Sequence, residues 1–363
     1  MVGLWPRDRT ESAQNNEGSS MEVSPNGPSR EPERGRGRRR KWPFVVGGLV
    51  ALGLIGLAVF AVVLILALGI AGGPTAPVVY DEEYVSGDGP EKVAVVPVEG
   101  TIAPADDSLG GTQPTVTPEG LSEALRQASG DPSVAAVVLE VNSPGGGVTA
   151  SDEMHQSILD FRENTGKPVV VSMGDVAASG GYYISTAADR IVANETTLTG
   201  SLGVIFEITN FAEAADKYGI KQVVIKSGKY KDIGSAFREM TPGEREIFQS
   251  IVDESYSEFV DVISEGRGIP EERVREIADG RVYSGAQAEE LGLVDSFGDL
   301  DEASSTAGRL AHTDDTTVVR YVQEPTLADT VLARLAPHEP QAQQIMDAAG
   351  LNLEPKPYYL YRP

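Results

Sequence analysis

Residues 135–147 have the sequence AAVVLEVNSPGGG, and residues 168–181 have the sequence PVVVSMGDVAASGG. Each stretch begins with a nearly continuous apolar run and ends in a glycine-rich turn. A run without polar alternation predicts a strand that is covered on both faces, as in a parallel sheet. Apolar residues recur at helical spacing over 118–128, 151–161 and 241–266. The alternation of strands and helices predicts an α/β fold with a mainly parallel core.

The same criteria predict shorter elements along the rest of the chain. The additional predicted strands lie at 190–193, at 221–225 and at 316–322, and the additional predicted helices lie at 179–188, 211–218, 271–278 and 286–291. Residues 73–91 are predicted to be a linker, and residues 312–363 are predicted to hold one strand and then a flexible tail.

The charge is distributed unevenly. The chain has 363 residues and a formal net charge of −24. Residues 1–43 contain nine basic and six acidic residues, so the acidity belongs to the part that follows residue 72. The polar composition of residues 1–43 cannot bury enough apolar surface to form a core, which predicts a disordered tail. A strongly acidic domain argues against nucleic-acid binding.

Residues 44–72 contain no charged residue. This run exceeds the length of about 20 residues that a membrane-spanning helix needs, and it is longer than the apolar part of a cleaved signal peptide. The preceding sequence RGRGRRRK predicts a cytoplasmic N-terminus. We therefore expect a single-pass membrane anchor that binds lipid and places the C-terminal domain outside the cytoplasm.

The two glycine-rich turns are candidates for an acyl-transfer site. Glycines at a strand-to-helix turn allow backbone N–H groups to converge on a developing oxyanion. Ser179 stands between a strand and a helix start, in the manner of a nucleophile elbow, although the Gly-x-Ser-x-Gly pattern is absent. The alternative is that both turns are tight connections and that Ser179 caps a helix. Neither turn has the ending of a phosphate-binding Walker loop.

A serine nucleophile needs a base. The chain has no cysteine and only three histidines, none of which stands where a Ser-His-Asp arrangement is easily built: His155, His312 and His338. The other candidate bases are the lysines of the stretch KSGKYKD, Lys226, Lys229 and Lys231, although a solvated basic loop would look the same. Residue types alone do not choose among the three lysines. Ser201, in the turn TGSLG, is a candidate for orienting a lysine or for capping the turn.

These motifs resemble the signal peptide peptidase A (SppA) family, in its short single-module form anchored to the membrane. The resemblance spans about residues 92–300 and rests on VNSPGGGV, KPVVVSMGDVAASGGYYIS, TLTGSLGVI, KSGKYKDIG, REMT and ADGRVYSGAQAEELGLVD. It implies a Clp protease and crotonase type fold built from repeated ββα units, over a peptidase domain at 92–311.

The resemblance also implies a mechanism. It assigns Ser179 as the nucleophile, Lys231 as the general base and Ser201 as the residue that orients this lysine. The oxyanion hole would use backbone N–H groups of Gly145, Gly146 and Gly180. No cofactor or metal is implied. The implied substrates are cleaved signal peptides and other hydrophobic or unfolded segments, and the implied assembly is a closed ring of about eight subunits.

Three alternatives remain open from the sequence. One is a membrane Ser-Lys protease of the NfeD-type or stomatin-associated form, one is a crotonase-like enzyme acting on acyl-CoA, and one is a non-catalytic scaffold. Separately, acidic pairs such as Asp152-Glu153, Asp253-Glu254 and Glu289-Glu290 are scattered over predicted helices. A hydrated acidic surface of this kind is favoured at high salt, which predicts a halophilic, archaeal source.

Overall fold

The computed structural model describes residues 42–70, 79–104, 114–313, 315–323 and 357–360. The chain divides into two units, residues 1–74 and residues 75–363, which are described separately. In the first unit, the helix α1 spans Trp42–Ile70. Its side chains are described at 42, 46–57 and 59–60. Within the described residues, no helix combines the length and the apolar character needed to cross a membrane. The predicted membrane span at 44–72 stays a prediction.

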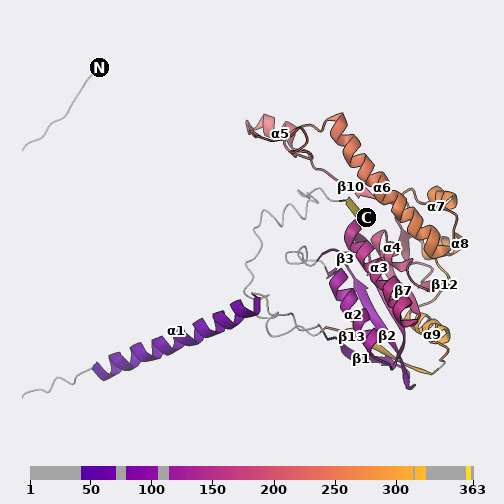
Figure 1. The fold of residues 1–363 in the computed structure, drawn as a ribbon, viewed down its shortest axis with the longest axis horizontal. Helices are drawn as coiled ribbons and strands as arrows, with labels where there is room; N and C mark the ends of the chain where they lie inside the picture. The colour runs from indigo at the N-terminus through magenta and orange to yellow at the C-terminus, as the bar shows by residue number, and fades with distance from the viewer. Residues whose placement is uncertain (1–41, 71–78, 105–113, 314, 324–356, 361–363) are drawn as a thin grey trace, which may run out of the picture. The chain divides into compact units, whose positions relative to one another are not determined.

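The second unit is built on a sheet of nine strands (Figure 1). Its main path, in spatial order, is β1 (Asp81–Ser86), β13 (Thr316–Val322), β2 (Glu91–Glu99), β5 (Val134–Ser143), β7 (Val169–Ala178), β8 (Arg190–Ala193) and β12 (Ser296–Phe297). From β13 to β12 all neighbours are parallel, as predicted, whereas β1 pairs antiparallel with β13. β9 (Leu198–Gly200) continues the sheet beside β7, and β11 (Val282–Ser284) pairs with β9.

Helices cover both faces of this sheet, which explains the continuous apolar runs. Along β5, Val137 and Leu139 belong to the larger core on one face, whereas Ala136 and Val138 belong to a smaller core on the other face. The larger core includes residues of α2 (Pro118–Gly130), α3 (Val148–Thr165), α4 (Gly180–Ser185), α6 (Pro242–Arg267), α7 (Glu271–Ile277) and α8 (Gly285–Glu290). The smaller core is closed by α9 (Leu300–Leu310).

A second, smaller sheet lies beside the glycine-rich turns. Its order is β10 (Ile205–Phe206), β14 (Pro357–Leu360), β6 (Gly145–Gly147), β3 (Thr101–Ile102) and β4 (Thr115–Val116). The chain thus repeats a strand in the main sheet, short strands in the second sheet and a helix, as in β2–β3–β4–α2 and β5–β6–α3. This arrangement is consistent with the predicted Clp and crotonase type fold.

Two predicted boundaries differ from the structure. The predicted linker 73–91 contains β1. The strand predicted at 316–322 is present as β13, but the segment after it, predicted as a flexible tail, contributes β14 to the second sheet. The compact unit therefore extends beyond residues 92–311 at both ends. The reason is pairing between distant segments: β1 pairs with β13, and β14 pairs with β6.

We call residues 207–240 the arm. It contains α5 (Ala212–Lys217) and joins β10 to α6. Figure 1 shows α5 standing clear of the main sheet, beyond the start of α6. The strand predicted at 221–225 is wrong: these residues form no strand, and Val223 and Ile225 are 86% and 97% exposed. Their apolar run has no neighbouring strand to pair with in the described residues.

Candidate active site

Ser179 lies at the sharp turn between β7 and α4. Its φ is +54° and its ψ is −116°, in a region that residues other than glycine rarely occupy. The Ser179 N–H donates to the Gly200 carbonyl at 2.8 Å, and the Ser179 carbonyl accepts from the Tyr183 N–H at 2.8 Å. These bonds fix the backbone on both sides of the side chain, as the predicted nucleophile elbow requires.

The Ser179 hydroxyl makes no hydrogen bond in the described structure. The residue is 1% exposed, and its Oγ has no hydrogen-bond partner in the described structure. It makes no capping hydrogen bond to α4. Ser179 thus occupies the N-cap position of α4, but its side chain does not make the hydrogen bond by which a serine usually caps a helix.

The structure brings the two glycine-rich turns into contact. A Cβ added to Gly180 would lie 3.1 Å from both Gly145 Cα and Gly146 N. A Cβ added to Gly146 would lie 1.8 Å from the Ile102 carbonyl oxygen, so only glycine fits there. Gly180 is the first residue of α4, where a helix leaves its N–H groups without internal acceptors. The backbones of both turns thus lie close together next to Ser179.

One of the three predicted oxyanion donors already makes a hydrogen bond within the chain. The Gly145 N–H donates to Ser143 Oγ at 3.1 Å, and Gly145 has a φ of +95°. Gly146 and Gly180 remain as the candidates. Sequence reasoning did not single out Ser143, or Ser151, whose Oγ would lie 2.5 Å from a Cβ on Gly180.

Ser201 lies beside Ser179. β9 runs parallel to β7 with Gly200 opposite Ala178, so Ser201 and Ser179 each follow the last paired residue of their strands. Ser201 has a φ of +50°, and its N–H donates to the Arg281 carbonyl at 2.8 Å. The two serines that the sequence placed in separate turns therefore end neighbouring strands at one sheet edge.

Lys231 is not bonded to Ser179 within the chain. It is exposed on the arm, its N–H donates to the Gly228 carbonyl at 3.2 Å, and its Nζ makes no hydrogen bond or ion pair with the described residues. The other two lysines are engaged: Lys226 pairs with Asp232, and Lys229 Nζ lies 3.0 Å from the Tyr230 hydroxyl. That hydrogen bond raises the pKa of Lys229, which disfavours the neutral form that a base needs.

Neither of the two described histidines makes a hydrogen bond to Ser179. His155 is buried on α3, its Nδ1 has no partner in the described structure, and its ring packs edge-on against Tyr183 at 5.2 Å. His312 is exposed after α9, and His338 lies outside the described residues. Within those residues, no group of three His, Asp or Glu side chains is placed to hold a metal ion.

β14 occupies the space along β6. It pairs antiparallel, with Tyr358 opposite Gly147 and Leu360 opposite Gly145, and on its other side it pairs with β10. It also contacts α3 and α4, the helix that begins directly after Ser179. Sequence reasoning missed this strand, although the run YYLY at 358–361 is rich in residues favoured in strands.

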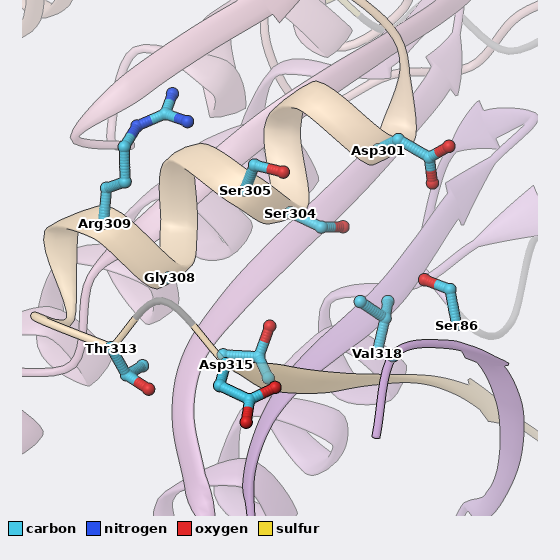
Figure 2. A pocket seen from close by; sticks show the side chains of 11 residues that line it. Ser86, Asp301, Ser304, Ser305, Gly308, Arg309, Thr313, Asp315 and Val318 are labelled. Carbon is cyan, nitrogen blue, oxygen red and sulfur yellow. The ribbon is translucent and has the colours of Figure 1, made fainter. Parts of the chain in front are cut away.

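A separate cavity lies on the other face of the main sheet. It is lined by α9, β1 and β13, including Ser86, Asp301, Ser304 and Asp315 (Figure 2). The Ser304 hydroxyl is buried and has no partner in the described structure. None of the predicted site residues lines this cavity.

Known proteins are similar to this chain along most of its length. The sequence pattern of peptidase family S49 matches residues 162–314. The "Putative protease slr0021" of Synechocystis sp. is 37% identical over 262 residues, which are 72% of this chain and 88% of the relative. The "Putative signal peptide peptidase SppA" of Enterococcus faecium is 32% identical over 290 residues, 77% of this chain and 84% of the relative. "Protease 4" of Salmonella typhi is 36% identical over 66% of this chain and 38% of its own length.

The fold, the strained serine beside backbone donors and these relatives together define a serine-type peptidase. The chain belongs to peptidase family S49, within the SppA family. The resemblance inferred from the sequence motifs is thereby confirmed.

Proposed function

We propose that this chain is a membrane-anchored endopeptidase that uses Ser179 as its nucleophile and Lys231 as its general base. The observation that carries this proposal is the Ser179 turn: a strained backbone presents an uncommitted hydroxyl beside the glycine turns at Gly146 and Gly180. Strain of this kind is retained where the surrounding structure and the function require it.

The reaction is acyl transfer to serine and then to water. Neutral Lys231 accepts the hydroxyl proton as Ser179 Oγ bonds to the carbonyl carbon of the peptide. The carbonyl oxygen becomes an oxyanion, which the N–H groups of Gly146 and Gly180 stabilise. Lys231 then donates its proton to the leaving amine as the C–N bond breaks. Water, deprotonated by the same lysine, hydrolyses the acyl-enzyme. Ser201 orients the lysine.

The peptide binds as an added strand along β6. β14 already takes this position, antiparallel to Gly145–Gly147 and between β6 and β10. Main-chain pairing gives affinity with little sequence selectivity, which suits degradation of varied segments. The chain's C-terminal strand and a substrate would therefore compete for one place.

Lys231 is supplied by a second copy of the chain. Within one copy it lies on the exposed arm, and the Ser179 hydroxyl has no partner. The arm exposes Tyr218, Ile220, Val223 and Ile225 to solvent. Apolar surface of this extent is typical of an interaction site. A head-to-tail contact in which each arm reaches the Ser179 turn of the next copy closes into a ring, consistent with about eight subunits.

The substrates are cleaved signal peptides and other hydrophobic or unfolded segments at the membrane surface. The uncharged run at 44–72 would anchor the chain with its N-terminus in the cytoplasm and its peptidase unit outside. A ring with inward-facing sites would exclude folded proteins.

The experiment that tests the dyad compares single variants of the full chain. Ser179→Ala and Lys231→Ala should each abolish peptide hydrolysis while the protein stays folded, and Lys229→Ala is the matched control from the same loop. A serine-directed fluorophosphonate probe should label the wild type and not Ser179→Ala. Hydrolysis by Lys231→Ala at near wild-type rates would refute the dyad, and a dead Lys229→Ala would move the base to that residue.

Mixing the two inactive variants tests the origin of the lysine. If each site takes its serine and its lysine from different copies, an equal mixture of co-assembled Ser179→Ala and Lys231→Ala recovers about one quarter of wild-type activity, because that fraction of sites has both groups. If each site is built within one copy, the mixture stays inactive. An inactive mixture would refute the proposal that the site is shared between copies, and it would leave the proposed dyad standing.

Substrate profiling separates the competing enzymes. Mass mapping of digested signal peptides, wild type against Ser179→Ala, should show many cuts in apolar segments. One cut in one partner protein would favour the NfeD-type or stomatin-associated form. Turnover of an acyl-CoA without peptide hydrolysis would favour the crotonase-like alternative, and the absence of probe labelling would favour a scaffold.

A further inference from the structure

Most side chains of the arm are exposed, but two carboxylates near Lys231 are largely buried. The Asp232 side chain, directly after Lys231, is 12% exposed, and that of Glu244, at the start of α6, is 3% exposed. Arg238 lies between these two carboxylates and contacts both.

The Arg238 guanidinium uses its N–H donors to link Asp232 to α6. Its Nε donates to Asp232 Oδ2 at 3.1 Å, and its Nη2 donates to the main-chain carbonyl of Asp232 at 2.9 Å. Its Nη1 donates to Glu244 Oε2 at 2.9 Å, and its Nη2 also contacts Glu244 Oε1. A planar fork with several fixed donors suits such a double bridge, whereas an ammonium group does not.

Glu244 is a rigid anchor for this bridge. It is the third residue of α6 and completes a capping box with Thr241: its Oε2 accepts from the Thr241 N–H at 2.8 Å and from the Thr241 hydroxyl at 3.0 Å. Further along, α6 places Phe259 and Ile263 in the core. The position of Glu244 is therefore set by the body of the domain.

Both carboxylates stay ionised at neutral pH. Hydrogen bonds from Arg238 lower the pKa of Glu244 to about 2, and hydrogen bonds from Arg238 and then Lys226 lower the pKa of Asp232 well below its ordinary range. The bridge is charge-assisted at both ends and persists at any pH at which a lysine could act as a base.

We propose that Arg238 is a positioning residue for Lys231, because it holds the adjacent residue Asp232 by both its carboxylate and its main-chain carbonyl. A simple surface ion pair contributes little and would not need the carbonyl contact. By fixing this carbonyl, Arg238 sets the backbone from which the Lys231 side chain extends. The inference rests on the proposed function, in which Lys231 is the base.

The expected effect lies in the chemical step. Misplacement of a catalytic group by about 1 Å costs on the order of 100-fold in rate. Arg238→Gln should therefore lower kcat by about 100-fold, with KM within about twofold, because the strand-binding groove along β6 is untouched. Arg238→Lys keeps the charge and can hold only one carboxylate at a time, so it should restore part of the lost kcat.

The experiment uses the full chain and a fluorogenic peptide, with Arg273→Gln as the matched control. Arg273 forms an exposed pair with Glu276 on α7, away from the arm, and its loss should leave kcat unchanged. Hydrogen exchange should rise at the amides of residues 231–234 in Arg238→Gln and remain unchanged in the control. The double variant with both Arg238→Gln and Glu244→Gln should have the same kcat as Arg238→Gln alone, because both substitutions break the same bridge.

Wild-type kcat in Arg238→Gln, with Lys231→Ala inactive, would overturn the positioning role and leave the proposed dyad standing. Full activity of Lys231→Ala would instead overturn the dyad, whatever Arg238→Gln does. If Arg238→Gln does not fold, Arg238→Lys carries the test: at an unchanged melting temperature its kcat should fall by about 10-fold, and an undiminished kcat would overturn the inference.

Discussion

Acid should destabilise the peptidase unit through one buried histidine. His155 is 6% exposed on α3, and its ring packs against Tyr183. Burial lowers its pKa to about 4, and the nearby Asp152 carboxylate offsets this only in part. In the unfolded chain the imidazole is in water, with a pKa of about 6.5. Folding therefore favours the neutral form of His155.

The magnitude follows from these two pKa values. Above pH 6.5 the imidazole is neutral in both states and contributes nothing to pH dependence. As the pH falls from 6.5 to 4, the unfolded state binds a proton that the folded state does not, so the free energy of unfolding falls. The loss reaches about 2 kcal/mol at pH 5 and is complete at about 3 kcal/mol below pH 4. Such a loss is a large part of a typical domain's stability.

The assay is urea unfolding of wild type and His155→Phe at pH 7 and pH 5, at one salt concentration. Phenylalanine keeps an aromatic ring against Tyr183 and removes the titration. We expect the wild type to lose about 2 kcal/mol more than the variant between these pH values. His312→Gln is the control, since His312 is exposed. Equal pH dependence in the wild type and His155→Phe would refute the reasoning.

Three further predictions follow from the site and the surface. Gly180→Ala places a Cβ 2.5 Å from Ser151 Oγ and should lower kcat at least 100-fold. Adding Ser151→Ala should restore part of the lost kcat, whereas a wild-type kcat in Gly180→Ala would contradict the assigned contact. Deletion of residues 357–363 removes β14 from β6 and should raise kcat/KM for peptides, with inhibition by the added C-terminal peptide; unchanged kcat/KM would show that β14 and substrate do not compete. The acidic surface should make the domain unfold in about 0.1 M salt and fold in multimolar salt, as circular dichroism would detect, and equal stability in both would count against a halophilic source.

Most of the helices and the central strands could be predicted because their signals are local, although the helix α9 at Leu300–Leu310 was missed. A helix satisfies its own hydrogen bonds, so the apolar spacing and the Thr241–Glu244 capping box suffice to predict α6. The runs in β5 and β7 are apolar at nearly all successive positions of their first halves because both faces of the sheet are covered. The glycine-rich turns after these strands made Ser179 and the neighbouring backbone N–H groups candidates for the site.

Only the tertiary structure decided which segments pair and which side chains meet. A strand exists when another edge accepts its hydrogen bonds, and that partner can lie anywhere in the chain. Thus β1 and β14 form against β13 and β6, whereas the run KQVVI at 221–225 forms no strand.

The same distinction applies to the candidate site. The motif resemblance named Lys231, yet no local pattern indicates that its Nζ stands apart from Ser179, or that Arg238 bridges Asp232 to Glu244. Nor could it show that the Gly145 N–H is already bound to Ser143. Sequence patterns determine the chemistry that each residue can perform, and the fold decides which residues are close enough to perform it, because hydrogen bonds and charge contacts act only over a few ångströms.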